Sequence, residues 1–350
     1  MTSHWVGRSV TCAGIILSIL GLLASRPAAA DAPHGVFALI GRNMSSPTAS
    51  FLAKTIYTGL FFERNWNAVE GQNGIFDWSQ YDQIVADATT YGKQLMLGVH
   101  QGLVNDGFPA WLQVPLFSCS DGSRGAIPWN SMFQAYYTRV LGELVKRYAA
   151  HPTVVGFFVE GHYNWASDDF NLCQSTSQDR QAWIQLGYTR QLMQQTSFRL
   201  YAMVATYTDK FIRVPSAIGM LNETTGNTDL QSTQAYYIEP FLAQYGNRGG
   251  IGRTMFDQNT GDVAQIWNTT PPTAQFALLD AYTPRIWGQR RPENQGGPTD
   301  EQSYLKMADI ALHYGVQFFE VGPSQISTYP NAISCLNAVL RAGGGHCGHD

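Results

Sequence analysis

Residues 154–165 read VVGFFVEGHYNW: an apolar run ends in one carboxylate, Glu160, and a loop rich in Gly, aromatic and amide side chains follows. An apolar run of this length is typical of a strand that is buried on both faces of a parallel sheet. The carboxyl ends of such strands carry the active sites of α/β barrels. The sequence therefore makes Glu160 a catalytic candidate, whereas the alternative is an acidic residue that merely begins a loop.

Eight candidate strands alternate with helical or loop segments along the rest of the chain. Alternation of this kind, repeated about eight times, is the signature of an α/β fold of the (β/α)8 TIM barrel type. The competing fold is a doubly wound open sheet, which usually has a Gly-rich phosphate loop after its first strand, and GRNMSSP at 41–47 is not such a loop. The predicted strands are 35–41, 57–62, 94–100, 154–160, 199–207, 250–256, 274–280 and 316–322.

The segments between the strands have the apolar spacing of amphipathic helices. Residues 131–150 repeat apolar side chains at i, i+3, i+4 and i+7, and so does the segment that follows a possible cap at Asp77. Residues 301–314 repeat the pattern, and 330–341 are expected to form a closing helix. No linker or repeat divides the chain after residue 30, so we expect one catalytic domain over 31–350.

The first thirty residues have the features of a secretory signal peptide. Arg8 precedes an apolar stretch too short to span a bilayer, and Ala28–Ala30 offers a cleavage site. We therefore expect a secreted or periplasmic protein. The formal charge of −4 gives no reason to expect nucleic acid or a membrane as partner. The composition, with 14% charged and 13% aromatic residues, is common among secreted enzymes that act on neutral, hydroxylated ligands.

Four cysteines remain once the first thirty residues are removed. An even number in an oxidising compartment favours two disulfides, for which three pairings exist. We favour Cys335–Cys347, which are close in sequence, and this leaves Cys119–Cys173 to join the loops after the third and fourth strands. The cysteine spacing does not suggest a metal site, and we see no motif that calls for a metal or another cofactor.

Acidic residues stand at or just beyond six of the predicted strand ends. In a closed barrel these ends converge on one mouth, so that carboxylates distant in sequence become neighbours. Cleavage of a glycosidic bond needs two carboxyl groups, one to protonate the leaving oxygen and one to act as nucleophile or base. The six residues are Glu63, Glu160, Asp209, Asp257, Asp280 and Glu320.

Aromatic and polar residues beside the same strand ends suit the binding of a sugar. Aromatic rings pack on the C–H faces of sugars, while amide and imidazole groups bond to their hydroxyls, although any single ring is more often a packing residue. The residues that we predict to bind substrate are Glu63, Trp66, His100, His162, Asn164, Trp165, Tyr282 and Trp287.

Two stretches of the sequence resemble clan A glycoside hydrolases, especially β-galactosidase-like members. The first is FFERNWNAVEGQNGIFDWSQYDQIVADATTYGKQLMLGVHQG followed by FPAWL, within 61–112. The second is YYTRVLGELVKRYAAHPTVVGFFVEGHYNW, residues 136–165. The resemblance implies a (β/α)8 barrel in which Glu160 is the acid/base. It also exposes a departure, because the family usually has Asn before that Glu and this chain has Val159.

The second carboxylate is less clearly indicated. The resemblance implies a Glu nucleophile at the end of strand seven. The strand count places Asp280 there, and the residue type favours Glu320, which by the same count follows strand eight. We expect Glu320 to be the second catalytic carboxylate and keep Asp280 as the alternative.

Three hypotheses follow from these patterns. The first is a secreted glycoside hydrolase, retaining and without cofactor, that cleaves O-glycosidic bonds of an oligo- or polysaccharide. The second, which Val159 motivates, is a catalytically silent carbohydrate-binding barrel. The third is a polysaccharide lyase, which the scarcity of basic residues near the predicted mouth disfavours.

Overall fold

Eight parallel strands close into a barrel in this computed structural model, which describes residues 32–104, 106–159, 172–216, 219–256, 286–290 and 297–347. Around the barrel the strands follow one another in the order β1-β12-β11-β10-β7-β6-β3-β2, and the register between neighbours is parallel throughout. The predicted TIM barrel is thereby confirmed. Its strands are β1 (Gly35–Ile40), β2 (Gly59–Asn65), β3 (Gln94–His100), β6 (Val154–Phe158), β7 (Phe211–Ser216), β10 (Gly249–Phe256), β11 (Ile286–Arg290) and β12 (Val316–Val321).

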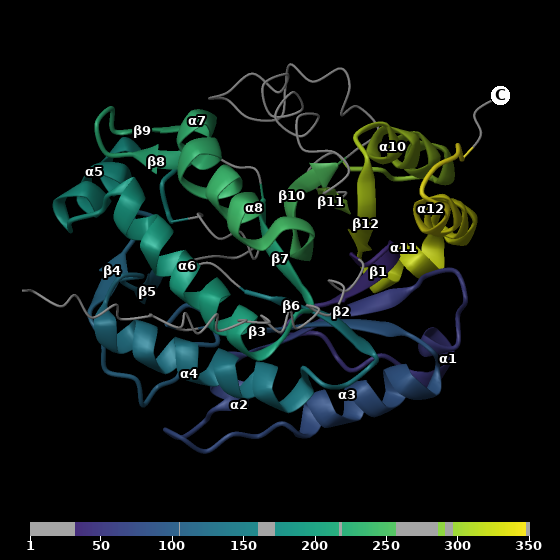
Figure 1. Ribbon diagram of the computed structural model, residues 1–350, viewed down its shortest axis with the longest axis horizontal. Coiled ribbons are helices and arrows are strands. Elements are labelled where there is room, and N and C mark those ends of the chain that lie inside the picture. Colours follow the sequence, from purple (N-terminus) through teal and green to yellow (C-terminus); the bar gives the residue numbers. More distant parts are fainter. Residues whose placement is uncertain are drawn as a thin grey trace, which may run out of the picture.

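Helices surround the barrel on its outside (Figure 1). The predicted helices at 131–150, 301–314 and 330–341 are present, and the one after Asp77 begins at Ser79, whose N–H donates to the Asp77 carboxylate over 2.9 Å. The helices are α1 (Ala49–Leu52), α2 (Trp66–Val69), α3 (Ser79–Thr90), α4 (Ser131–Tyr148), α5 (Ser177–Gln185), α6 (Arg190–Tyr207), α7 (Leu230–Thr233), α8 (Glu239–Tyr245), α10 (Glu301–His313), α11 (Pro323–Thr328) and α12 (Pro330–Ala342).

The strand predicted at 199–207 is wrong, because this segment belongs to α6. Met193, Leu200, Tyr201 and Val204 are buried at helical spacing, whereas the sequence reading treated the end of this stripe as a continuous apolar run. The fifth place in the barrel is taken by β7 instead. Asp209, which was expected at the carboxyl end of a strand, therefore precedes β7. Its Oδ1 lies 3.6 Å from Nη1 of Arg248 in an ion pair.

The seventh strand also differs from the prediction. β11 occupies the place between β10 and β12, and it reads IWGQR. The segment 274–280, including Asp280, lies outside the described residues, and so does Asp257. Because β7 replaces the misplaced fifth strand without changing the count, Glu320 stays on the eighth strand.

Two separate apolar cores hold the barrel. The larger lies between the strands and the helices, and the smaller fills the barrel interior with one side chain from each of six strands. Gly98 makes room for this interior layer, since a Cβ there would stand 3.0 Å from the Phe158 ring. The interior residues are Phe37, Phe61, Met96, Phe158, Phe211 and Phe318.

Two disulfides join parts of the outer shell, in the pairing that the sequence predicted. Cys119 pairs with Cys173, and Cys335 pairs with Cys347. The first connects the hairpin β4 (Leu116–Ser118)–β5 (Arg124–Ala126) with the segment before α5.

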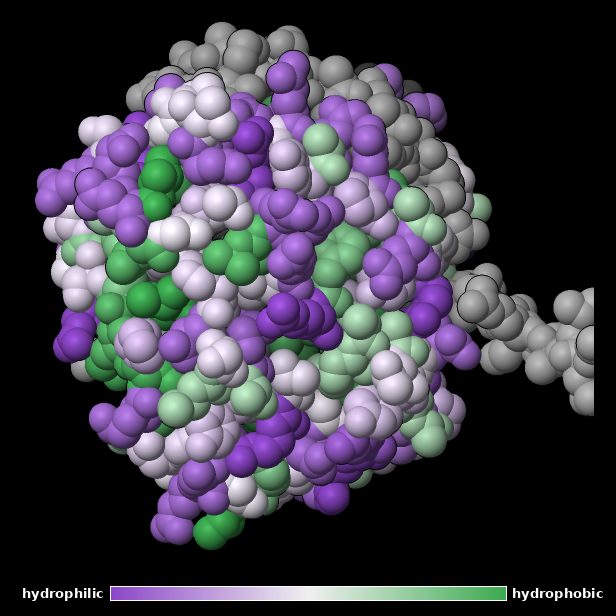
Figure 2. All heavy atoms as spheres, turned by 60° about the vertical axis from the view of Figure 1, so that its left-hand side comes forward, coloured by the Kyte–Doolittle hydropathy of each residue, from purple (hydrophilic) through white to green (hydrophobic). Residues whose placement is uncertain are grey.

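The outer face formed by α4, α5 and α6 carries hydrophobic residues separated by hydrophilic ones (Figure 2). Met132, Leu186 and Tyr207 are among its exposed apolar side chains. A second hairpin, β8 (Met220–Asn222)–β9 (Asn227–Asp229), lies next to α5, where Arg180 donates to the Gly226 carbonyl over 2.8 Å. Among the described residues, no helix combines the length and the apolar character that crossing a membrane requires.

Candidate functional site

Three ionisable side chains lie inside the barrel, one step toward the carboxyl ends of the strands from the phenylalanine layer. Glu63, Arg213 and Glu320 each follow an interior phenylalanine by two positions, on β2, β7 and β12 respectively. Side chains two positions apart on a strand share a face, so all three point into the barrel. The Arg213 guanidinium confirms the stacking of the layers, since it lies 4.3 Å from the centre of the Phe158 ring.

Arg213 and Glu320 form an ion pair across the barrel. Nε of Arg213 lies 2.8 Å from Oε1 of Glu320, and Nη2 donates to Oε2 over 3.0 Å. Each side chain is only 1% exposed. Burial raises the pKa of Glu320 from 4.5 to about 7; the Arg213 charge opposes this rise and nearby Glu63 adds to it. The site thus holds a carboxyl group that titrates near neutral pH.

A second polar group lies at the carboxyl ends of β1 and β3. His100 is buried, and Arg42 donates from Nη1 to its imidazole, with 3.2 Å to Nδ1. Burial lowers the pKa of His100 to about 4, with Arg42 lowering it and Glu63 and Asp106 raising it. At neutral pH the imidazole is therefore uncharged and accepts from Arg42. Arg42 also forms an ion pair with Asp106, in which Nη2 lies 3.1 Å from Oδ2.

The loop after β3 is fixed beside this group. Asn65 donates to the side chain of Asn43 over 3.0 Å, and Asn43 donates to Asp106 over 3.3 Å. Gly107 has φ of +99°, and a Cβ there would stand 2.6 Å from the Asn65 amide. Only a residue without a side chain lets this loop approach the strand so closely.

The β4–β5 hairpin, which follows β3, is joined to the segment before α5 by the Cys119–Cys173 disulfide. Beside it, buried Asp179 accepts from the backbone N–H of Ser120 over 2.9 Å and from the hydroxyl of Thr176 over 2.7 Å. The hairpin and the start of α5 are thus connected by a covalent bond and by a buried carboxylate.

Trp66 is not a platform for substrate, contrary to the sequence-based expectation. Its side chain is 0% exposed and its indole N–H donates to Glu70 over 2.9 Å. Its ring packs edge-on against Trp111 and tilted against Tyr137, so no face remains for a sugar. A Trp directly after a strand is here the first residue of α2 and part of the core beneath the loops.

Several other predicted site residues lie outside the part of the chain that the structure describes. These are Glu160, His162, Asn164 and Trp165 after β6, and Asp280 and Tyr282 before β11. Trp287 is placed by its backbone on β11, paired in register with Gly252 and Phe318. Of the predicted residues, the structure brings together Glu63, His100 and Glu320.

Sequence reasoning missed Arg213 and Arg42. The alternation FIR at 211–213 carries the signal for Arg213, since Phe and Arg two positions apart share one face of a strand. That signal was lost because the fifth strand was placed too early. Arg42 is the second residue after β1, and no neighbour in sequence predicts its contact with His100. Among the described residues, no three His, Cys, Asp or Glu side chains gather as ligands for a metal ion.

The model of a glycoside hydrolase family, glycoside hydrolase family 42 (beta-galactosidase), matches residues 56–232, just over half of the chain. The chain belongs to this family. The matched region begins before β2 and ends in α7, and it includes Glu63, His100 and Arg213. Family and fold support glycosidase activity, and the family implies a carbohydrate substrate. No protein with a curated description matches the sequence.

Solved structures of glycoside hydrolases share the barrel of this family 42 member at low sequence identity. The catalytic domain of the beta-amylase from Paenibacillus polymyxa has a TM-score of 0.62 and 12% identity, with 89% of this chain and 100% of that chain covered. The beta-galactosidase from Marinomonas ef1 has a TM-score of 0.53 and 12% identity, covering 82% and 53% respectively. Endo-glycoceramidase II from Rhodococcus sp. has a TM-score of 0.50 and 13% identity, covering 88% and 79%. At such identities the likeness shows the fold alone.

Proposed function

We propose that the protein is a secreted glycoside hydrolase that cleaves O-glycosidic bonds of an oligo- or polysaccharide, with Glu160 as general acid and Glu320 as the second carboxylate. The observation that carries the proposal is the interior layer of Glu63, Arg213 and Glu320, because it gathers ionisable groups from distant parts of the chain at the carboxyl ends of the strands. The family supplies the reaction type.

The role of Glu160 rests on its position in the sequence, two residues beyond the end of β6. Phe158, the last residue of β6, packs in the barrel interior, and Glu63 and Glu320 follow the interior residues Phe61 and Phe318 by the same two positions. We propose that the alternation of β6 extends by two residues, which would bring Glu160 into the same interior layer. A carboxyl group among apolar walls and other carboxylates stays protonated to higher pH and can protonate the leaving oxygen.

Glu320 acts as nucleophile or base in its ionised form. Burial raises its pKa to about 7, so the ionised form prevails above that pH, and Arg213 stabilises it while Glu63 opposes it. By analogy with the clan we propose a retaining reaction, for which the two carboxyl groups should be about 5–5.5 Å apart, against about 6.5–9.5 Å for inversion. Proton NMR of the first-formed sugar anomer distinguishes the two outcomes.

We also propose that residues 1–30 direct export and that residues 31–350 act as one catalytic domain. The signal-like pattern of the first thirty residues and the two disulfides support this placement, since disulfides persist in oxidising compartments.

One observation favours a second candidate function, a carbohydrate-binding barrel without turnover. The clan pattern places its nucleophile on strand seven, and β11 reads IWGQR, without a carboxylate. Glu320 is on the next strand and is engaged by Arg213. A barrel of this kind would bind sugars through the same mouth and release no product.

The deciding experiment incubates the protein with a panel of β-galactosides and polysaccharides and measures new reducing ends. We expect product from the wild type and a loss of roughly 10²–10⁴-fold in Glu160→Gln, the range for removal of a general acid. Glu143→Gln, on the outer surface of α4, is the matched control and should keep full activity. Affinity for a sugar without any product would replace the hydrolase with the binding protein.

A further inference from the structure

A cavity of about 740 Å³ opens at the end of the barrel opposite the candidate catalytic mouth. His34, Thr58 and Lys93 line it, and each stands directly before a barrel strand, namely β1, β2 and β3. The last turn of α12 closes the other side through Arg341. The cavity is large enough for a small molecule, for which pockets of about 300–1,000 Å³ are usual.

The lining of this cavity is cationic. Lys93, Arg341 and His34 contribute basic side chains, and no Asp or Glu is among the fourteen residues that line it. This is unexpected in a chain whose formal charge is −4. A water-accessible cavity with basic groups and no carboxylate in its wall favours an anionic occupant.

The Lys93 ammonium is bound by neutral groups of the protein. It donates to the carbonyl oxygens of Tyr57, over 2.9 Å, and Lys54, and it lies 3.9 Å from the centre of the Tyr57 ring. These partners are neutral, and burial lowers the pKa of Lys93 to about 8. An anion in the cavity would supply the counter-charge that none of the described lining residues provides.

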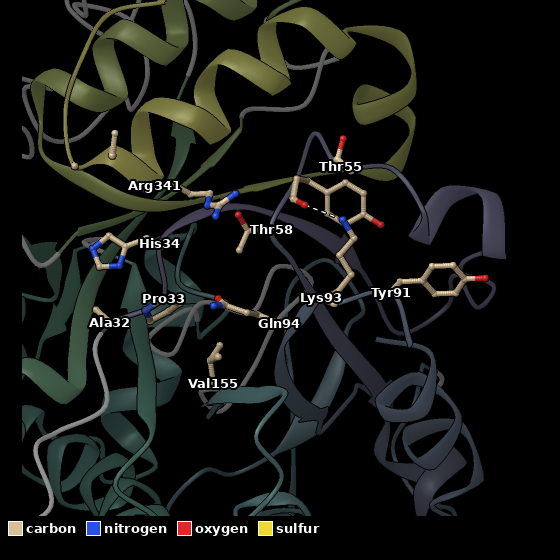
Figure 3. Close-up of a pocket in the computed structure, with 14 residues that line it drawn as sticks. Ala32, Pro33, His34, Thr55, Thr58, Tyr91, Lys93, Gln94, Val155 and Arg341 are labelled. Atoms are coloured by element: carbon tan, nitrogen blue, oxygen red, sulfur yellow. Dashed lines mark hydrogen bonds between the residues drawn. The ribbon is translucent and has the colours of Figure 1, made fainter. Parts of the chain in front are cut away.

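Uncharged polar groups face the same space. In Figure 3, Arg341, Thr58 and Gln94 surround the open centre of the cavity, whereas Tyr91 points away. Oε1 of Gln94 is buried without a hydrogen-bond partner among the described residues. The Thr58 hydroxyl donates to Asn337 over 2.7 Å, which leaves its oxygen able to accept. Acceptors of this kind suit the hydroxyl groups of a ligand.

The carbonyl ends of two helices, α3 and α12, border the cavity and oppose an anion. Both ends are capped by backbone N–H groups: Gly343 and Gly344 donate to Leu340 and Val339 over 3.4 and 3.1 Å, and Tyr91 donates to Asp87 over 3.0 Å. These caps satisfy some of the terminal carbonyls, so the helix ends weaken the attraction of the basic groups without reversing it.

We propose that this cavity is a binding site for a small hydroxylated oxyanion, a polyol that carries a carboxylate or a phosphate group. Arg341 and Lys93 attract the charged group, while Gln94 and Thr58 accept from the hydroxyls. A ligand held in this way would connect the end of α12 to the starts of β2 and β3. The site is independent of the hydrolytic proposal, because none of its residues belongs to the catalytic mouth.

Isothermal titration calorimetry on the wild-type protein tests this site with three probes: gluconate, inorganic phosphate and uncharged sorbitol. We expect saturable binding of gluconate or phosphate, and sorbitol should bind at least about tenfold more weakly than the better anion. Binding of gluconate alone identifies a sugar acid as the ligand type, and binding of phosphate alone identifies the phosphate group as the dominant determinant. Absence of saturable binding for both anions, or equal binding of sorbitol, overturns the proposal.

Arg341→Gln supplies the decisive variant, because Arg341 is exposed and its loss should not affect folding. The matched control is Arg199→Gln, an exposed residue of α6, a helix that contributes no residue to the cavity lining. We expect Arg341→Gln to weaken anion binding about tenfold and Arg199→Gln to leave it unchanged. Equal weakening in both variants would reveal a general charge effect and overturn the site.

Discussion

The two ends of this barrel hold buried charge in different ways. At the carboxyl ends of the strands, Arg213 and Glu320 satisfy each other inside the barrel, and Arg42 is joined to Asp106. At the amino ends, Lys93 is bound by neutral carbonyl oxygens in a cavity with no carboxylate among its described lining residues. The difference is that the buried charge of Arg213 has a carboxylate partner within the fold, whereas the described partners of Lys93 are neutral and leave its charge for solvent or a ligand.

The largest effect on activity should come from Glu320→Gln at the carboxyl end. If Glu320 is the nucleophile or base, turnover falls by roughly 10²–10⁴-fold while the protein remains folded. Initial rates of glycoside cleavage measure this, with Glu143→Gln as control. An active Glu320→Gln variant would assign Glu320 to structural support and move the search for the second carboxylate elsewhere.

Replacing Arg213 and Lys93 by neutral residues should lower the free energy of unfolding by different amounts. Arg213→Met leaves the Glu320 charge buried without its partner and should cost about 3–5 kcal/mol of unfolding free energy. Lys93→Met leaves only neutral carbonyls and should cost about 1–3 kcal/mol. Urea denaturation followed by circular dichroism measures both.

The double variant Arg213→Met/Glu320→Gln provides the control for charge. It should be more stable than Arg213→Met alone, because the unpaired carboxylate is gone. A double variant less stable than the single one would show that packing, not the buried charge, sets the cost.

The two disulfides close loops of different length. Cys119–Cys173 spans a sequence separation of 54 residues and Cys335–Cys347 spans 12. Loop-closure entropy then gives about 4 kcal/mol for the first and about 3 kcal/mol for the second. Paired Cys→Ser variants in thermal unfolding test the order, and greater destabilisation from the shorter loop would contradict it.

The smallest effect concerns the dependence of stability on pH. The pKa of Glu320 is raised to about 7 in the folded protein. Between pH 4.5 and 7 the folded protein therefore keeps a proton that the unfolded chain has lost. The contribution of Glu320 to the free energy of unfolding falls as the pH rises through this range. The pKa of His100 is lowered to about 4, so between about pH 4 and its ordinary value of 6.5 stability rises with pH.

Two variants separate these opposing contributions. Relative to wild type, Glu320→Gln should become more stable as pH increases from 4.5 to 7, and His100→Gln should become less stable from 4 to 6.5. Unfolding midpoints across this range provide the measurement. If the unfolding midpoints of wild type and variant change with pH in parallel, the pKa shift of the replaced residue is wrong.

Much of the barrel was readable from the sequence, for a physical reason. Strands such as 94–100 are apolar on both faces and helices such as α4 have a clear stripe, so their periods are unambiguous. The strand predicted at 199–207 is wrong because exposed apolar residues of α6, such as Ala202 and Tyr207, lie between and beside the buried ones and give a nearly continuous apolar run. β7 was passed over because Arg213 and Pro215 interrupt its apolar sequence, FIRVPS.

The candidate site was less predictable, because it depends on pairs formed across the barrel. Glu320 was found from its place at a strand end, but its pairing with Arg213, 107 positions away, leaves no local signal in the sequence. Trp66 looked like a sugar platform from its place after β2, and only the packing of Trp111 and Tyr137 around it shows that it is core. The disulfides were predictable because loop placement and sequence proximity left one natural pairing.

The most direct test of the central claim compares kcat/KM of wild type and Glu160→Gln on two glycosides of one sugar, one with a dinitrophenol leaving group and one with an alkyl alcohol. A good leaving group departs without a proton, so we predict a large loss, roughly 10²–10⁴-fold, on the alkyl glycoside and a small loss on the dinitrophenyl glycoside. Equal losses on both substrates, or no loss on either, would contradict the assignment of Glu160 as the proton donor of a hydrolytic barrel.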